Sequence, residues 1–211
     1  MKKVMIVDYG LGNLFSIKQA LTAVGADAFC SSNAKDIQAC DGILLPGVGA
    51  FADAMNRLRQ LDLVDAIRDA AVSGRPVLGV CLGLQLLFDR SHEFGIHEGL
   101  GLISGEVLKF PDIHNKMALK VPFIGWNELN ITVEGKKNMI MENFVDSSKI
   151  FFVHSYYVSP KSETNILATC EYEGFKFPTL VGQKNVIGIQ GHPEKSATQG
   201  LNIYKNWVTN L

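Results

Sequence analysis

The stretch Pro76-Val77-Leu78-Gly79-Val80-Cys81-Leu82-Gly83-Leu84-Gln85 decides the fold of this chain. A short apolar run ends in Gly-x-Cys-x-Gly, and a segment of helical character follows. That order predicts a strand, a sharp turn and a helix, the arrangement of a nucleophile elbow with a thiol in place of a hydroxyl. Gly79 and Gly83 keep the turn uncrowded, and a helix start favours the thiolate form of a cysteine. We therefore predict that Cys81 is a catalytic nucleophile.

Outward from this elbow, apolar runs alternate with helical patterns over the first ninety residues. The pattern predicts strands at 4–7, 26–30, 42–45 and 77–80, and helices at 13–24, 51–58 and 63–72. Strands that alternate with helices imply a parallel sheet with right-handed crossovers.

From about residue 100 short strand-like segments dominate, at 106–110, 126–130, 150–153, 166–170, 179–182 and 186–190. Turn signals such as Glu134-Gly135 and Lys184-Asn185 separate them, and a last helix is expected at about 198–208. Because no Pro-, Ser- or Gly-rich linker divides the chain, we expect this half to extend the first sheet. The expected class is α/β, one domain over 1–211, with a mixed, mostly parallel central sheet flanked by helices and an added antiparallel part in the C-terminal half.

Composition narrows the function classes. Of the 211 residues 47% are hydrophobic and 19% charged, as in ordinary soluble globular proteins, and the net charge of −1 argues against a nucleic-acid or anionic-membrane surface. No apolar window approaches the length that spans a bilayer. The four cysteines lie far apart without a C-x-x-C pair, which suits a reducing compartment. We expect a cytoplasmic protein with no membrane or nucleic-acid partner.

Two further motifs fail to indicate a cofactor. The segment His92-Glu93-Phe94-Gly95-Ile96-His97-Glu98 matches no zinc spacing, and we interpret it as a polar surface loop. The segment Asp8-Tyr9-Gly10-Leu11-Gly12-Asn13 lacks the third glycine of a dinucleotide fingerprint, because Phe15 stands there. We expect neither a metal nor a nucleotide cofactor.

His192 is the candidate base for Cys81. It follows the apolar strand predicted at 186–190, and open α/β sheets build their sites at the carboxyl ends of strands. In an extended segment residues i and i+2 point the same way, and Pro193 favours extended backbone at His192. Glu194 can therefore orient the imidazole, which completes the nucleophile, base and orienting group of a triad. His154 ends another predicted strand and either lines the site or is structural.

An acyl-transfer site also needs N–H donors for an oxyanion. The N–H of Leu82, directly after the nucleophile, is one candidate. The glycine turn Pro46-Gly47-Val48-Gly49 follows the strand at 42–45 and can present a second donor. We expect Val48, Gly49 and Leu82 to form the oxyanion hole, although such a turn can also simply end a strand.

The elbow cysteine, the late His-Pro-Glu and the Pro-Gly-x-Gly turn together resemble the class I (triad) glutamine amidotransferases over nearly the whole chain. Within that family the chain most resembles the glutaminase subunits of imidazole glycerol phosphate synthases, from histidine biosynthesis. The supporting strings are DYG-x-GN at 8–13, LPGVGAF at 45–51, GVCLG-x-Q at 79–85, GWN at 125–127, FVHSY at 152–156 and HPEKS at 192–196.

The resemblance implies a role for each matching residue. Cys81 would attack the side-chain amide of L-glutamine, His192 would protonate the leaving ammonia and later activate water, and Glu194 would orient His192. The amino-acid end of glutamine would be held by Gln85, Ser155, Tyr156 and backbone near Gly49.

The resemblance also implies a partner, because the chain contains no second active site that could use the ammonia. Asn13, Trp126 and Lys195 would face that partner. In the resembled family it is a (β/α)₈ cyclase subunit, which forms a heterodimer with the glutaminase and uses the ammonia to make imidazole glycerol phosphate and AICAR.

The chain departs from the family pattern at two places. Phe123-Ile124 stands where the family usually has His-Met, and Gly191 replaces a Phe before the expected catalytic histidine. We expect Gly191 to loosen the segment that carries His192. Both departures bear on the partner and on activation.

Three other functions stay open. A paralogous glutaminase could feed a sugar amidotransferase in surface polysaccharide synthesis. A catalytically silent scaffold is disfavoured because Cys81, His192 and Glu194 are all intact. A thiol hydrolase on a similar fold is disfavoured because Gln85 and Ser155-Tyr156 match a glutamine pocket.

Overall fold

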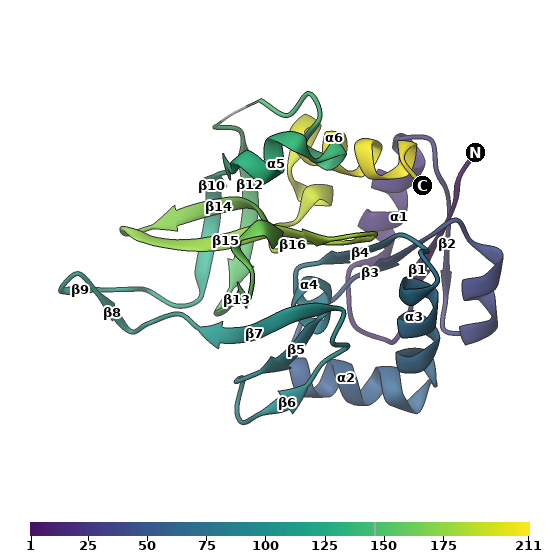
Figure 1. The fold of residues 1–211 in the computed structure, drawn as a ribbon, viewed down its shortest axis with the longest axis horizontal. Helices are drawn as coiled ribbons and strands as arrows, with labels where there is room; N and C mark the ends of the chain where they lie inside the picture. Colours follow the sequence, from purple (N-terminus) through teal and green to yellow (C-terminus); the bar gives the residue numbers. More distant parts are fainter. Residues whose placement is uncertain (146) are drawn as a thin grey trace.

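An eight-stranded mixed sheet runs through the centre of the protein. The computed structural model describes residues 1–145 and 147–211. In spatial order (Figure 1) the strands are β11 (Asn130–Ile131), β14 (Ile166–Tyr172), β15 (Phe175–Gln183), β16 (Val186–Ile189), β4 (Val77–Val80), β3 (Gly42–Leu45), β1 (Lys3–Val7) and β2 (Asp27–Ser31). The five strands from β16 to β2 are parallel neighbours, whereas β11, β14 and β15 add antiparallel pairs. The predicted mixed, mostly parallel sheet with an antiparallel extension is confirmed.

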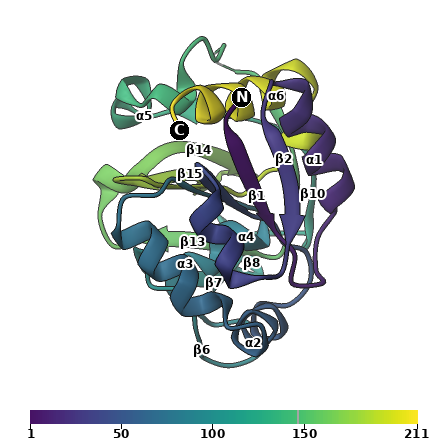
Figure 2. The same ribbon diagram turned by 90° about the vertical axis from the view of Figure 1, so that its right-hand side faces the viewer.

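Helices cover both faces of this sheet (Figures 1 and 2). One face carries α1 (Leu14–Ala23), α5 (Val133–Lys137) and α6 (Ala197–Thr209), and the other carries α2 (Phe51–Gln60), α3 (Leu63–Val72) and α4 (Leu82–Leu86). Short 3₁₀ turns are η1 (Ala34–Ala39), η2 (Met139–Met141), η3 (Glu163–Asn165) and η4 (Pro193–Lys195). None of the helices within the described residues is long and apolar enough to cross a membrane.

The inner parallel strands β1, β3, β4 and β16 are buried on both faces, which explains their continuous apolar runs, whereas β2 lies at the edge of the sheet and is partly exposed. Along β1, Val4 and Ile6 belong to the core cluster under α1 and α6, while Met5 and Val7 belong to the cluster under α2 and α3. Because side chains alternate across a strand, each of these residues packs into one of the two cores.

The C-terminal half extends the central sheet only in part. β13 (Tyr156–Pro160), β7 (Ile103–Lys109), β5 (Phe88–Ser91) and β6 (His97–Glu98) form a separate four-stranded sheet. β10 (Phe123–Glu128) pairs with β12 (Lys149–His154), and β8 (Ile113–His114) pairs with β9 (Met117–Ala118) in a hairpin that projects from the body (Figure 1).

The expectation that the C-terminal half extends the first sheet was therefore wrong for 106–110 and 150–153, and for 126–130 except Asn130, which joins the sheet in β11. Alternating apolar residues predict that a strand exists, but its partner depends on long-range packing. Here Phe110, Phe123, Phe152 and Phe177 gather around His154, with each of these rings 5.0–6.2 Å from another ring of the group. This aromatic cluster holds β7, β10 and β12 against β15 in place of pairing within the sheet.

The predicted turn at Glu134-Gly135 is also wrong, because both residues lie inside α5. Thr132 caps this helix, and its hydroxyl oxygen accepts from the Gly135 N–H at 3.0 Å. A Cβ at Gly135 would lie only 1.9 Å from the carbonyl oxygen of Leu167. The glycine is required there by close backbone approach and not by a turn.

Candidate active site

Cys81 lies between β4 and α4 in the strand, turn and helix that the sequence predicts. Its backbone has φ 56° and ψ −112°, an unfavourable conformation for a residue with a side chain. The flanking glycines are required by packing, because a Cβ at Gly83 would lie 1.8 Å from the Leu45 oxygen and one at Gly79 would lie 2.7 Å from the Gly83 oxygen. The turn thus holds the thiol in one strained position at the carboxyl end of the sheet.

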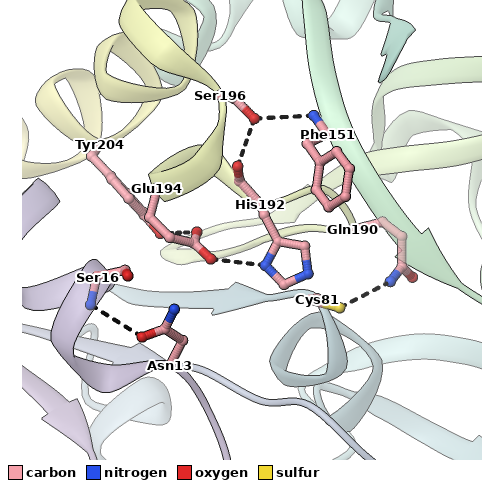
Figure 3. A network of polar contacts seen from close by, with 9 residues as sticks. All are labelled: Asn13, Ser16, Cys81, Phe151, Gln190, His192, Glu194, Ser196 and Tyr204. Atoms are coloured by element: carbon pink, nitrogen blue, oxygen red, sulfur yellow. Dashed lines mark hydrogen bonds and ion pairs between the residues drawn. The ribbon is translucent and has the colours of Figure 1, made fainter. Parts of the chain in front are cut away.

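The end of β16 brings the predicted base beside this thiol. Val80 and Ile189 are register partners in the parallel pair β4–β16, and the Cys81 N–H donates to the Ile189 oxygen at 2.8 Å. The next residues of the chain, Gln190, Gly191 and His192, therefore leave the sheet next to Cys81. Figure 3 shows the imidazole of His192 between the Glu194 carboxylate and the sulfur.

Glu194 is the hydrogen-bond partner of His192. Nδ1 of His192 lies 2.8 Å from Oε1 of Glu194, and the two side chains are 4% and 1% exposed. Pro193 begins the short turn η4, so the pair forms across a 3₁₀ turn and not along the extended segment that we expected. The Tyr204 hydroxyl on α6 donates to the other carboxylate oxygen at 3.1 Å, which fixes the carboxylate from behind (Figure 3).

Ser196 holds the backbone of this segment. Its hydroxyl donates to the His192 carbonyl at 2.6 Å and accepts the Phe151 N–H at 3.0 Å (Figure 3). The His192 N–H in turn donates to the Phe151 carbonyl at 2.9 Å. These contacts fasten the histidine to β12.

The electrostatics of His192 suit proton transfer. Burial lowers the pKa of His192, but its interactions with the Cys81 thiolate and the Glu194 carboxylate outweigh burial and raise it to about 9. At neutral pH the imidazole of His192 is therefore protonated. It can give its proton to a leaving group at the sulfur.

A cavity of about 270 Å³ opens at the sulfur and gathers most of the residues that the sequence singled out. Its lining includes Val48, Gly49, Cys81, Leu82, Gln85, Ser155, Tyr156 and His192. A larger hollow of about 530 Å³ lies between α5 and the strands β14 and β15, and none of the predicted site residues lines it. Chemistry, and not size, therefore identifies the smaller cavity as the candidate site.

The cavity is also lined by Glu93, which we predicted to lie in a polar surface loop. One of its carboxylate oxygens accepts from the Phe51 N–H at the start of α2, at 2.6 Å. The carboxylate thus gives the cavity a negative group. A lone Glu among polar neighbours carries no spacing signal, so only the fold could place it.

His154, for which the sequence left two roles open, lines the cavity and also belongs to the aromatic cluster. It is buried, and Nδ1 lies 2.8 Å from the Tyr156 carbonyl oxygen. Burial is the main cause that lowers the pKa of His154 to about 4. The ring is therefore neutral, with its proton on Nδ1, because a carbonyl only accepts.

The two expected oxyanion donors are not both available in this conformation. The Leu82 N–H donates to the Gly47 carbonyl oxygen at 3.4 Å. Val48 is 44% exposed, and Gly49 has φ 104°, a conformation that favours glycine. The glycine turn is where the sequence predicts it, but the Gly47 carbonyl occupies the position that an oxyanion would take beside Leu82.

The residues expected to face a partner are all exposed. Asn13 caps α1 by accepting the Ser16 N–H at 3.3 Å (Figure 3). Trp126 is 52% exposed, and its ring lies 5.9 Å from that of Phe151, while Nζ of Lys195 lies 5.8 Å from the same phenyl ring. Trp126 and Lys195 therefore share one surface next to His192.

The expectation that Gly191 loosens the histidine segment was wrong. Gly191 is buried, and a Cβ there would lie 2.4 Å from Cγ2 of Ile150 and 3.2 Å from Cε1 of Phe152. Side chains of β12 fill the space next to Gly191, so the segment is closely packed. The second departure from the family pattern is Phe123-Ile124. Phe123 joins the aromatic cluster, whereas Ile124 is 61% exposed.

Comparison with known proteins agrees with this geometry. The family model "Glutamine amidotransferase class-I" matches residues 5–211. The chain belongs to this family. It is similar to the imidazole glycerol phosphate synthase subunit HisH of Methanosarcina acetivorans, with 48% identity over 99% of the chain and 98% of the relative. The subunit HisH of Geobacillus thermodenitrificans is 43% identical over 99% and 96%.

Solved structures show the same fold at low identity. "Structure of PurLQS from Thermotoga maritima" matches with a TM-score of 0.75 and 18% identity, over 100% of this chain and 99% of that chain. "Crystal structure of glutamine amidotransferase" matches with a TM-score of 0.74 and 18% identity, over 98% and 99%.

Proposed function

We propose that this chain, as one amidotransferase domain over 1–211, is the glutaminase subunit of an imidazole glycerol phosphate synthase. The observation that carries the chemistry is the buried His192–Glu194 pair beside the strained thiol of Cys81. The similarity to HisH subunits over nearly the full length supports the particular pathway.

The reaction begins when the Cys81 sulfur attacks the side-chain carbonyl carbon of glutamine. The carbon–nitrogen bond breaks, the nitrogen takes a proton from the His192 imidazolium, and ammonia leaves a glutamyl thioester. Neutral His192 then takes a proton from water as the water oxygen attacks the thioester. Glutamate leaves and the thiolate returns, so the sum is glutamine and water to glutamate and ammonia. Glu194 holds the imidazole in the tautomer that both transfers need.

The cavity has groups for both ends of an amino acid. The Glu93 carboxylate and the side-chain oxygen of Gln85 can accept from an α-ammonium group. Backbone N–H groups near Gly49 and the segment Ser155-Tyr156 can hold the α-carboxylate. These groups select free glutamine over a glutamine residue inside a peptide, because a residue inside a peptide has neither an α-ammonium group nor an α-carboxylate.

The product requires a partner, since ammonia released into water at neutral pH becomes ammonium, which is not a nucleophile. We propose that a (β/α)₈ cyclase docks on the surface formed by Asn13, Trp126 and Lys195 and receives the ammonia directly. The cyclase would use it to form imidazole glycerol phosphate and AICAR in the cytoplasm.

A glutaminase assay on the purified chain, with and without a candidate cyclase and its nucleotide ligand, tests both the glutaminase activity and the choice of partner. We expect little turnover by the chain alone, because the Gly47 carbonyl occupies the oxyanion position, and strong stimulation by the liganded cyclase. Loss of a single oxyanion donor typically costs about 100- to 1000-fold. High turnover without the cyclase would contradict the role given to Gly47.

The variant Cys81→Ala separates the mechanism from the pathway. It should abolish glutaminase activity in the complex while cyclase binding persists, with Cys40→Ala as the control for loss of a buried thiol elsewhere. Retained activity in Cys81→Ala would overturn the mechanism. Failure of the cyclase to bind or stimulate would overturn the pathway and leave the glutaminase standing.

A further inference from the structure

A chain of buried amides leads from the backbone of β13 to the catalytic sulfur. Nε2 of Gln85 lies 3.2 Å from the Tyr156 carbonyl oxygen and 3.1 Å from Oε1 of Gln190. Nε2 of Gln190 lies 3.8 Å from Sγ of Cys81 (Figure 3). Gln190 is fully buried.

The polarity of this chain follows from one atom, the Tyr156 carbonyl oxygen. A carbonyl can only accept, so the group of Gln85 that faces it is the NH₂ and not the oxygen. The same NH₂ group of Gln85 faces Gln190, which therefore presents its own oxygen to Gln85. The NH₂ group of Gln190 is then turned toward the sulfur, and no other assignment satisfies all three contacts.

This orientation leaves two groups prepared for the reaction. The Gln85 oxygen remains available to a substrate ammonium group in the cavity, and an N–H of Gln190 points at the nucleophile. A hydrogen bond to an ionised acceptor is shorter and stronger than one between neutral groups. Burial of Gln190 keeps water from competing for that contact, so the N–H favours thiolate over thiol.

We propose that Gln190 is a further catalytic residue of the glutaminase, which donates a hydrogen bond to the Cys81 thiolate and locks Gln85 in its substrate-binding orientation. The inference rests on the proposed function, in which Cys81 is the nucleophile. It adds to the His192–Glu194 pair a second, uncharged stabiliser of the thiolate. Gln190 remains a donor after His192 has given its proton to ammonia.

The test is the pH dependence of Cys81 alkylation by iodoacetamide, followed by mass spectrometry of the Cys81 peptide in the full chain. Gln190→Met removes the N–H donor with little change in side-chain length. We expect the pH of half-maximal alkylation to rise by about one unit, so that alkylation at pH values well below this midpoint slows about tenfold. Gln183→Met, at the other end of the β15–β16 pair, should leave the profile unchanged.

Gln190→Glu keeps the oxygen that Gln85 needs and replaces the NH₂ group by a second oxygen. It should slow alkylation at least as much as Gln190→Met, while KM for glutamine changes less than in Gln190→Met. A purely structural role would lower kcat in both variants without moving the alkylation profile, and that result would overturn the proposal.

One measurement needs no substitution. In chain labelled with ¹⁵N-glutamine, carbamidomethylation of Cys81 should shift the side-chain NH₂ resonance of Gln190 and leave that of Gln183 in place. An unmoved Gln190 resonance would overturn the contact even if both variants failed to fold. If the complex showed no glutaminase activity but alkylation still depended on Gln190, the proposed function would fail and the contact would stand.

Discussion

Nδ1 of His192 lies 2.8 Å from Oε1 of Glu194, while the Tyr204 hydroxyl, ten residues further on, holds the other oxygen of that carboxylate. Both oxygens of the Glu194 carboxylate are thus held by hydrogen bonds, and the side chain is almost fully shielded from solvent. Because one oxygen is committed to Tyr204, the other is directed at the imidazole. The pair is therefore one unit with α6 and not a chance contact of two neighbours in a turn.

Glu194→Gln should move the alkaline limit of catalysis to lower pH. Without the carboxylate the pKa of His192 falls from about 9 toward its ordinary 6.5, so the imidazolium that protonates ammonia is lost earlier as pH rises. We expect kcat to fall by roughly 100-fold or more at pH 8. A pH profile of kcat from 6 to 10 in the cyclase complex measures this. Glu134→Gln, on the exposed face of α5, is the control; an unmoved alkaline limb in Glu194→Gln would contradict the assignment.

His154 should make the fold sensitive to acid. Its pKa is lowered to about 4 in the folded chain against an ordinary 6.5, so the unfolded chain binds the proton more readily. Stability from this group is complete above pH 6.5 and is lost as pH falls toward 4, by up to about 3 kcal/mol. His154→Asn should flatten the loss measured by urea unfolding between pH 7 and 4.5. His114→Asn, on the projecting hairpin, should leave that slope as it is, and a steep slope kept in His154→Asn would place its cause elsewhere.

Gly191→Ala should destabilise the chain by about 1–3 kcal/mol, because its Cβ would meet Cγ2 of Ile150 at 2.4 Å. Thermal unfolding of Gly191→Ala, Ile150→Ala and the double variant gives the coupling between the two sites. Removal of the Ile150 methyl should relieve the clash, so the double variant should be more stable than the sum of the single losses allows. Additive losses would show that Ile150 is not what restricts position 191.

Trp126→Ala should weaken binding of the proposed cyclase by roughly 30-fold, since exposed tryptophans at interfaces are frequent hot spots. Its half-exposed ring lies over Phe151 near His192, so stimulation of the glutaminase should fall with binding. Calorimetric titration measures the affinity. Ile113→Ala is the matched loss of an exposed apolar side chain, 68% exposed on the β8–β9 hairpin, and should have no effect. Equal weakening in both variants would remove Trp126 from the interface.

Sequence reasoning predicted the parallel half of the fold well because its inner strands are buried on both faces and are bounded by clear helix signals. The elbow was equally easy to predict, since Gly-x-Cys-x-Gly combines a fixed spacing with the need for glycine on both sides of a tight turn. His192 and Glu194 were found because chemistry demanded a base and an orienting group. The pair was expected along extended backbone, and the 3₁₀ turn that forms it came only from the structure.

What sequence reasoning missed depends on packing between distant segments. Gln190 lies 109 residues from Cys81 in the sequence, and a single glutamine carries no sequence pattern that predicts a contact between its amide and a sulfur. β7 pairs with β13 and β5, and β12 pairs with β10, all outside the central sheet, while four phenylalanine rings from distant segments gather around His154. Glycine at position 191 predicted a flexible backbone, but the side chains of Ile150 and Phe152 fill the space beside it.

The parallel pair β4–β16 has a consequence for how such a protein can diverge. Cys81 hangs from the end of one strand and His192 from the end of its neighbour, and the Cys81 N–H donates to the Ile189 oxygen at 2.8 Å between them. The chain leaves this strand pair after β4, forms all the elements from α4 to β15, and returns to pair with β4 through β16. Ile124, which is 61% exposed on β10, can be exchanged without changing this ladder. In the proposed complex with a cyclase, the exposed residues of the ribbon β10–β12 can therefore change while the strand pair that carries Cys81 and His192 stays the same.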